Sequence, residues 1–575
     1  MWKYRNQTLI SVIGLAVGFT CFALATLWVV YEMTFDSFHK NTHNMYVVYI
    51  PSSSQAGLTN TTPTPLAAYL KETFPEIVNA ASLARNQSTV TINGTNSRVY
   101  SLMVDSSFFR MFDVKVLEGA WEFLVPGSKK VAVTQEKAKQ LFGDEYPIGK
   151  MINENDEIGA VVSEMSKHSN YSFEIIRPAP DYTSIQQRIQ NIISPWSVIL
   201  SGNNTIIELY PGTNIEAFEK KLYEHEIKND RSIISKMTIK PLTKLRYTDP
   251  SREMAREVKF QHIVIFAVSG LLVILCSLFN YLTLFISRFR IRQKELALRV
   301  VCGASGSSLL ALLSVEFLLT LLFSVMLGFL LTFFFHNPFL TLSEISMSLP
   351  VIYRESLLYI GSVILVSLLV FWLILFIFRK RSLNISIRRS SNKIFRKASV
   401  VVQLMISIGF AFCTIIMLKQ MFFLYNSGEL GFSFKNRGSI TVYGDDVETL
   451  GDRVKQIPEI MEVVDVKSMT PLLPQRSWSS KEFDLWDDQP PNAEKISLEQ
   501  ATVSQEYTSF YDFRLVAGEM LTDADPETMV LLNEAAVKAF GWYDAVGKHF
   551  DKYTVKGVIK NVSNYAPTIS VNPAF

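Results

Sequence analysis

Long stretches with almost no charged residues dominate the polarity pattern of the chain. Five of them reach or exceed the roughly 20 residues that a helix needs to cross about 30 Å of hydrocarbon. The first is too long for the apolar part of a cleaved signal peptide and has no small-x-small cleavage site, so it is predicted to be a retained anchor. The predicted membrane helices are Leu9–Tyr31, Gln261–Ser287, Leu309–His336, Leu357–Phe378 and Ser399–Leu424.

Two long polar regions, residues 32–258 and 425–575, separate or follow these helices. Both alternate short β-branched and aromatic runs with amphipathic helices, a pattern typical of α+β domains. The first region is expected to have two lobes. Its predicted strands are Met45–Ile50, Ser88–Ile92, Ser97–Val104 and Thr205–Tyr210, and its predicted helices are Pro65–Phe74 and Asn214–Glu226. The second region should hold a strand at Ser439–Tyr443 and a helix near Asp446–Gln456.

One sequence pattern occurs in both polar regions. FDVKVLEG, VAVTQEKAKQLFG and IGK, starting at Phe112, recur as YDFRLVAG, VLLNEAAVKAFG and VGK, starting at Tyr511. The register agrees within a residue or two, so that Gly143 corresponds to Gly541 and Lys150 to Lys548. Because each copy follows a predicted membrane helix, the pattern predicts an internal duplication of a helix joined to an exported domain.

Basic residues beside the helices predict the orientation in the membrane. They gather at the N-terminus (residues 1–8), between the second and third helices, and in the loop 379–398, which has no acidic residue. A path of five helices places all three segments on one side. They are therefore predicted to be cytoplasmic, and the two large domains to lie outside.

Composition supports a membrane protein, since 48 % of the 575 residues are hydrophobic. The net charge of +3 reflects these topological basic residues and does not indicate nucleic-acid binding. Neither exported region contains a cysteine, and no H-E-x-x-H or G-x-S-x-G motif is present. We therefore expect no catalytic residue, no metal and no cofactor.

The sharpest local motif is RQKELALRVVCGAS, residues 292–305. In a helix, Arg288, Arg292, Glu295 and Arg299 fall on one face, and Gly303 is placed to end the helix. A short amphipathic helix at 288–305, which we call the docking helix, suits the binding of a cytoplasmic partner. From the pattern alone, a juxtamembrane linker with positive-inside charge fits equally well.

The motif resembles R-x-K-E-I-x-x-R-x-x-x-G-A-S of the MacB/FtsX-like permeases of ABC transporters, matching it through Ala304 and Ser305. GLAVG at 14–18, FDSFHKNTHNMYVVY at 35–49, TPTPLAAYLKETFPEI at 62–77 and the repeated pattern add to this resemblance, which covers nearly the whole chain. It looks closest to the tandem permeases common in Bacteroidetes-type bacteria. The resemblance implies an α-helical membrane bundle with two MacB-like periplasmic core domains, 32–258 and 425–575. Residues 260–378 would be an FtsX-type three-helix module.

The resemblance implies a non-catalytic permease subunit of the bacterial inner membrane. A separate cytoplasmic ABC ATPase would bind the docking helix and drive extrusion of peptides, drugs or lipoproteins by mechanical transmission. A membrane-fusion protein and an outer-membrane channel are further partners to expect, with the halves pairing as a pseudo-dimer or two chains as a homodimer. The alternative is an FtsX-like regulator of an envelope hydrolase.

Three further features carry expectations. Gly14 and Gly18 have the small-x-x-x-small spacing of close helix packing, although an incidental pair is an open alternative. Glu316 lies inside the third helix, where a carboxylate marks either function or an interfacial packing role. The second exported domain has fewer residues after its repeated pattern than the first, so we expect a longer native product with three further helices.

Overall fold

The computed structural model gives two compact units, and the boundary between them falls within the helix Ser391–Asn426. Each unit is described by itself. The structure describes residues 5–51, 58–92, 95–125, 127–153, 156–179, 196, 203–228, 233–248, 258–292, 295, 298–299, 301–343, 345–381, 391–426, 430–438, 447–464, 479–491, 493–562 and 571–575.

Each predicted apolar run lies inside a long helix. Five helices among the described residues are long and apolar enough to cross a bilayer. Each extends beyond its apolar run, because polar residues at the ends continue the backbone hydrogen bonding. The helices are α1 (Arg5–Met33), α8 (Phe260–Ile291), α10 (Gly306–Ser343), α11 (Leu349–Arg381) and α12 (Ser391–Asn426).

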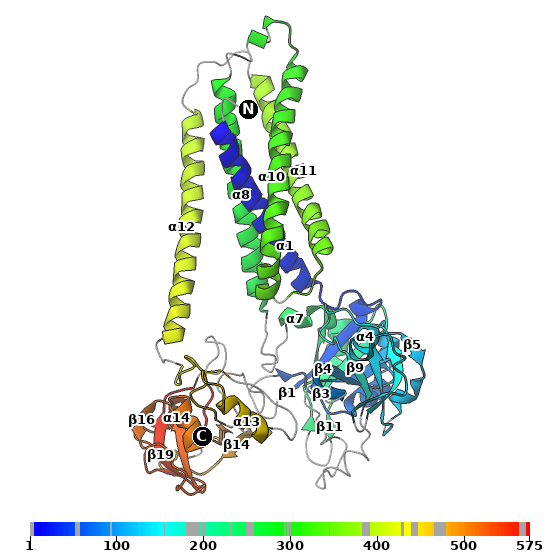
Figure 1. Ribbon diagram of the computed structural model, residues 1–575, viewed down its shortest axis with the longest axis vertical. Helices are drawn as coiled ribbons and strands as arrows, with labels where there is room; N and C mark the ends of the chain where they lie inside the picture. Colours follow the sequence, from blue (N-terminus) through cyan, green and yellow to red (C-terminus); the bar gives the residue numbers. More distant parts are fainter. Residues whose placement is uncertain are drawn as a thin grey trace. The chain divides into compact units, whose positions relative to one another are not determined.

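Helix α1 packs closely along α8 and α10, and also contacts α11 (Figure 1). Leu15, Phe19 and Ala23 are buried in this contact together with Phe317 of α10. The hydroxyl of Thr20 donates to the carbonyl of Gly328 on α10 at 3.0 Å. In the described hydrophobic stretch of α12, by contrast, no residue is buried. The first helix is therefore an integral part of the bundle rather than a peripheral anchor.

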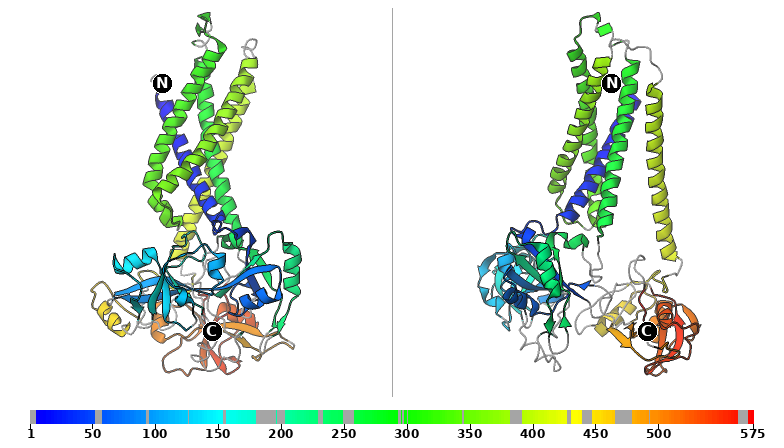
Figure 2. Two further views of the ribbon diagram at one scale, coloured as in Figure 1. Left: turned by 90° about the vertical axis from the view of Figure 1, so that its right-hand side faces the viewer. Right: turned by 180° about the vertical axis from the view of Figure 1, so that it is seen from behind.

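The first exported domain is built on one sheet of eleven strands (Figure 2). Its main path runs β13 (Thr238–Pro241), β1 (Met45–Pro51), β10 (Asn203–Leu209), β3 (Ile77–Ile92), β4 (Thr95–Val104), β9 (Ile175–Pro178), β6 (Lys130–Thr134), β8 (Asp156–Val162) and β5 (Val116–Gly119). Two short strands lie off this path: β2 (Leu58–Thr59) pairs with β1, and β7 (Met151–Asn153) with β8.

Helices cover the two halves of this sheet separately. The amphipathic α2 (Leu66–Thr73) and α6 (Ile215–Glu224) bury Leu70 and Leu222 against the half that contains β1 and β10. In the other half, α4 (Gln135–Phe142) packs on β6 and β8, and the short α3 (Phe108–Met111) precedes β5. The two halves expected within this domain therefore share one continuous sheet, because β3 and β4 pair over ten residues between them.

The second polar region, residues 425–575, forms a smaller domain in its described part. A hairpin of β14 (Ser479–Phe483) and β15 (Ile496–Gln500) accompanies a sheet of four strands. That sheet consists of β16 (Leu515–Gly518), β19 (Tyr553–Ile559), β17 (Met529–Asn533) and β18 (His549–Phe550), with helices α13 (Val447–Lys455), α14 (Gln505–Phe510) and α15 (Glu534–Phe540). The strand predicted at Ser439–Tyr443 lies outside the described residues.

The repeated sequence pattern has the same strand pairing in both domains. We call residues 108–162 the first lobe and residues 505–559 the second lobe. In the first, β8 pairs antiparallel with β5 and parallel with β6; in the second, β19 pairs in the same way with β16 and β17. The register shift recurs as well: it leaves Gly159 unpaired in the parallel ladder of β8, and Lys556 in that of β19.

Candidate functional site

Arg288 lies within α8 and faces α1, not solvent. Its side chain is only 6 % exposed and donates to the hydroxyls of Thr8 (3.0 Å) and Ser11 (3.5 Å) on α1. The prediction that Arg288 is part of the docking helix is therefore wrong, because α8 runs on to Ile291. Helix α8 continues for one turn beyond its apolar run, and this turn still packs against a neighbouring helix.

Arg292 follows α8 directly and bridges two carboxylates. Its guanidinium lies 2.9 Å from Glu316 on α10 and 3.2 Å from Glu295 in the docking helix. Glu295 also pairs with Arg299 at 3.2 Å, as its spacing predicted. The hydrogen bond from Arg292 is the main reason that the pKa of Glu295 lies below its ordinary value. Both carboxylates therefore hold the Arg292 guanidinium in place. Among the arginines of the predicted basic face, Arg299 is the most exposed.

The docking helix ends as predicted. Gly303 has a φ of +91°, and the amide of Ala304 donates to the carbonyl of Arg299 at 2.9 Å. This is the 6→1 hydrogen bond of a Schellman motif, which joins the first and last of six residues. Ser305 caps the next helix: its hydroxyl accepts a hydrogen bond from the amide of Ser308 at 3.2 Å, which begins α10. Leu298 and Val301 expose most of their surface on the described part of this helix.

At Gly18, α1 lies too close to α8 for a side chain to fit without a shift. A Cβ atom at this position would lie 2.3 Å from the hydroxyl of Ser277, whereas one at Gly14 would meet nothing closer than Asn280 at 3.9 Å. A comparable contact that the sequence did not single out is at Gly270 of α8, where a Cβ would lie 2.9 Å from that of Ala25. The two helices thus approach closely at small residues on both sides.

The C-terminal end of α1 is joined to the first large domain through Asp36. This residue has a φ of +55°, and its carboxylate accepts hydrogen bonds from the Ser169 hydroxyl and from the Asn170 side chain, the latter at 2.6 Å. The backbone amide of Asp36 donates to the carbonyl of His168. Burial raises the pKa of Asp36 to about 6, even though these hydrogen bonds favour its charged form.

A second set of contacts surrounds the same helix end. Glu32 is almost completely buried and pairs with Arg246 at 2.8 Å, while the Arg246 guanidinium lies over the ring of Phe35. The His168 ring stacks on Tyr31 with 4.1 Å between centroids, and its Nε2 lies 2.6 Å from the Tyr31 carbonyl. We call the contacts of α1 with 168–170 and Arg246 the outer joint. Sequence reasoning did not identify it as a site.

The segment after α12 is joined to the second lobe in a related way. Gly431 has a φ of +81°, and a Cβ there would lie 2.3 Å from the carbonyl of Asn561. Arg437 donates to the carbonyl of Phe510 at the end of α14 and pairs with Asp512 at 2.6 Å. Asp512 occupies the position in the repeated pattern that Asp113 has in the first lobe.

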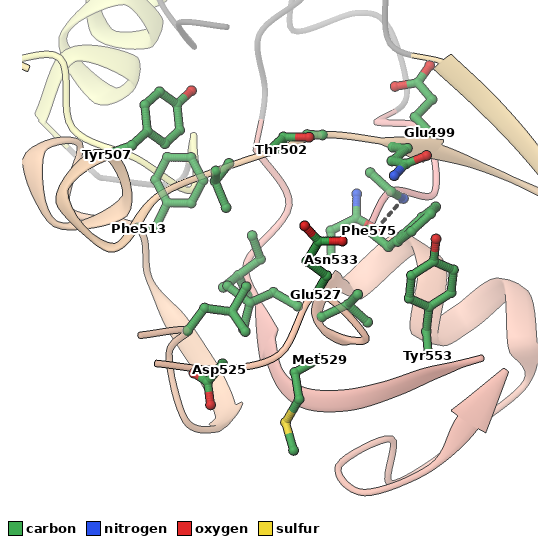
Figure 3. Close-up of a pocket in the computed structure, with 18 of the residues that line it drawn as sticks. Glu499, Thr502, Tyr507, Phe513, Asp525, Glu527, Met529, Asn533, Tyr553 and Phe575 are labelled. Carbon is green, nitrogen blue, oxygen red and sulfur yellow. Dashed lines mark hydrogen bonds between the residues drawn. The ribbon is translucent and has the colours of Figure 1, made fainter. Parts of the chain in front are cut away.

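The second domain contains a cavity of about 630 Å³ (Figure 3). Two polar residues of its lining are already engaged: Asn533 bonds to residues 572 and 574 of the C-terminal segment, and Asp525 pairs with Lys556 at 2.6 Å. Val562 and Val571 of the lining flank residues 563–570, which lie outside the described part of the chain. We therefore assign no ligand to it. Within the described residues, no group of three or more His, Cys, Asp or Glu side chains is placed to hold a metal.

Comparison with known families identifies the first part of the chain. Residues 8–224, which run from α1 through α6, match the family model of the MacB-like periplasmic core domain. The chain carries a MacB-like periplasmic core domain. This confirms the resemblance to MacB/FtsX-like permeases. The match also places α1 and residues 168–170 of the outer joint within the span of the MacB-like domain.

Among solved structures, a permease-protein domain from Porphyromonas gingivalis is 15 % identical over 37 % of this chain and 96 % of its own, with a TM-score of 0.29. The periplasmic region of MacB from Actinobacillus actinomycetemcomitans is 14 % identical over 32 % and 81 %, with a TM-score of 0.24. The extracellular domain of the noncanonic ABC-type transporter YknZ from Gram-positive bacteria is 14 % identical over 31 % and 89 %, also with 0.24. Comparison with curated proteins gives no match.

Proposed function

We propose that this chain is the permease subunit of an ABC transporter and that it hydrolyses no ATP itself. A separate cytoplasmic ATPase binds the docking helix, and the membrane helices carry its motion to the periplasmic domains. The observation that best supports this proposal is that both ends of α1 are attached to other parts of the chain. Arg288 holds its inner end to α8, and the outer joint holds its other end to the MacB-like domain.

The cargo we propose is periplasmic material such as peptides, drugs or lipoproteins, which the moving domains extrude. The transmission of motion suits a bundle whose long helices are packed by aromatic side chains, such as the stacked rings of Phe317 and Phe371. A membrane-fusion protein and an outer-membrane channel would complete the export route. The same mechanical route would serve an FtsX-like regulator of an envelope hydrolase, which is the alternative outcome of the test below.

We also propose that five helices cross the inner membrane, with the N-terminus in the cytoplasm and residues 32–258 and 425–575 in the periplasm. Cys302, which is exposed beside Gly303, would then face the cytoplasm. A membrane-impermeant thiol reagent should label it only after spheroplasts are opened. Labelling of Cys302 in intact spheroplasts would overturn this orientation.

The two lobes, we propose further, arose by duplication of a unit made of a membrane helix and an exported domain. Support comes from the common strand pairing, the common register shift, and the attachment of each preceding helix through a residue with positive φ. A pair of such units in one chain also suits a pseudo-dimeric permease, whereas a homodimer would need two chains in the purified complex.

Affinity purification of the tagged protein from its native membrane in mild detergent tests the proposed function. An ABC ATPase should co-purify with the wild type and be lost from the double variant Arg299→Glu, Val301→Asp, because both side chains are exposed on the docking helix. Arg354→Glu on α11 is the matched control, since this arginine is also exposed.

Recovery of the ATPase with the docking-helix variant, or its absence from the wild type, would contradict the proposal. The other proteins in the complex separate its two forms. A membrane-fusion protein or outer-membrane channel supports export, whereas an envelope hydrolase or its activator supports the regulatory alternative.

A further inference from the structure

Glu316 is the only Asp, Glu, Lys or Arg in the 38 residues of α10. It lies ten residues after Gly306, or about 15 Å of helix rise from the start of α10. A carboxylate among lipid-facing apolar residues is costly unless it is paired. Its partner is Arg292, at 2.9 Å, and both side chains are largely shielded, with 25 % of Arg292 and 19 % of Glu316 exposed.

The pair belongs to a line of alternating charges. Arg299 contacts Glu295, Glu295 contacts Arg292, and Arg292 contacts Glu316. The first two of these residues lie in the docking helix and the last in α10, so Arg292 is the link between the two elements. Its own backbone amide donates to the carbonyl of Arg288 at 3.1 Å, which continues the hydrogen-bond pattern of α8.

Neighbouring contacts restrict how this end of the bundle can move. One helical turn before Arg292, Arg288 holds α8 to α1 through Thr8 and Ser11. A displacement of the docking helix therefore reaches α10 through Arg292, while α8 and α1 stay attached to each other.

We propose that Glu316 is a positioning residue for ATPase coupling: through Arg292 it ties α10 to the docking helix, so that the two move as one body. This inference rests on the proposed function. It assigns to the carboxylate a mechanical role rather than a role in binding cargo or protons, and it predicts that the distance between the docking helix and the far end of α10 stays fixed during the ATP cycle.

The distance can be measured by double electron–electron resonance on the purified complex with its ATPase. One spin label is placed on the native Cys302 and the other on Leu342→Cys, both of which are exposed, with the remaining three cysteines replaced by serine. In the otherwise wild-type chain, the distance should be the same without nucleotide and with a non-hydrolysable ATP analogue. In Glu316→Gln, the analogue should shift or broaden the distribution beyond the wild-type width.

Arg292→Gln should have at least the effect of Glu316→Gln, because it also removes the pair with Glu295. The double variant should be no worse than Arg292→Gln alone, since either change already breaks the contact between Arg292 and Glu316. Glu355→Gln, which removes a carboxylate from an ion pair on α11, is the matched control and should behave as the wild type. Thermal unfolding of each variant shows whether the change in distance comes from loss of the contact between Arg292 and Glu316 or from loss of the fold.

Co-purification of the ATPase is scored in the same samples. If it binds the wild type and Glu316→Gln equally and both give identical distances in both nucleotide states, the inference is wrong while the proposed function stands. A wild-type distance that itself changes with the analogue overturns the inference too. If no ATPase binds the wild type, the proposed function has failed.

Discussion

The first and second lobes share their backbone geometry but place a comparable ion pair on different strands. In the first lobe Lys130 of β6 reaches Glu122, and Gly159 is the unpaired residue of the register shift. In the second, the unpaired residue is itself a lysine, Lys556 of β19, which reaches Asp525. The register shift therefore recurs in both lobes, whereas the lysine of the ion pair comes from β6 in the first lobe and from β19, the counterpart of β8, in the second.

The attachment of the lobes to the preceding helices differs in the same manner. After α1 the residue with positive φ is Asp36, whose carboxylate makes the contacts to residues 169–170. After α12 it is Gly431, whose missing side chain allows the backbone to approach Asn561. Similar chain paths are thus stabilised by a buried carboxylate in one case and by close backbone packing in the other. The two lobes thus have the positive φ after the helix in common, while the contacts that stabilise it differ between them.

The largest expected effect comes from the two glycines that end the edge strands. Gly119 and Gly518 have φ of +87° and +78°, and a Cβ at either would lie within 2.4 Å of a backbone carbonyl oxygen. Alanine at either position should lower the free energy of unfolding by at least about 3 kcal/mol, because strain and a backbone clash add. Thermal and denaturant unfolding of the purified chain measure this.

Gly143→Ala and Gly541→Ala provide the control. Both glycines also have positive φ but open space around the Cβ position, so only conformational strain is expected. It should cost about 1–2 kcal/mol at Gly541, whose φ of +72° and ψ of +19° are left-handed helical, and up to about 3 kcal/mol at Gly143, whose ψ is −126°. If the alanines at positions 119 and 518 cost no more than these controls, or differ strongly from each other, the equivalence of the two lobes is wrong.

An intermediate effect is expected where the segments after the helices contact equivalent aspartates. Arg437 is mostly buried between the Phe510 carbonyl and Asp512, whereas Lys40 is 86 % exposed and lies 3.9 Å from Asp113. Arg437→Gln should cost about 1 kcal/mol, since it removes the guanidinium that donates to the partly buried Phe510 carbonyl and pairs with the exposed Asp512. Lys40→Gln should cost less than about 0.5 kcal/mol. Equal effects of the two variants would remove this contrast.

The smallest effect concerns acid sensitivity. Hydrogen bonds from Lys556 and Thr522 lower the pKa of Asp525 to about 2. Because the folded-state pKa lies below the ordinary value, this carboxylate stabilises the fold above about pH 4 and loses its contribution as the pH falls from about 4 to about 2. Lys556→Met should therefore flatten the dependence of unfolding on pH in this window more than Lys130→Met does, since Glu122 is mostly exposed. Unfolding midpoints between pH 2 and pH 5 test this order.

Much of the architecture could be predicted from sequence periodicity. Runs of apolar residues give the five long helices, and the repeated pattern around Phe112 and Tyr511 gives two lobes of like topology. Spacing also placed the end of the docking helix at Gly303. These features depend on local hydrogen bonding and on the alternation of polar and apolar residues, which the sequence displays directly.

The contacts of the candidate site were less predictable. A spacing of three or four residues places Arg288 and Arg292 on one helix face, but it does not say whether that face meets solvent or another helix. Both arginines meet helices, since Thr8 and Glu316 supply the partners. In the outer joint, Asp36 contacts residues more than 130 positions away in the sequence. No local sequence pattern predicts such a pairing.

The position of β1 has a mechanical consequence. This strand is the first to follow α1, and it is hydrogen-bonded on both sides, to β10 and to β13, antiparallel to each. Interstrand hydrogen bonds lie perpendicular to the strands. Tension entering the domain along β1 therefore loads several bonds on two flanks in shear, so that they resist together instead of unzipping one after another. The chain thus enters the MacB-like domain at a reinforced point, where a pull transmitted through α1 would be shared across the sheet rather than concentrated on one edge.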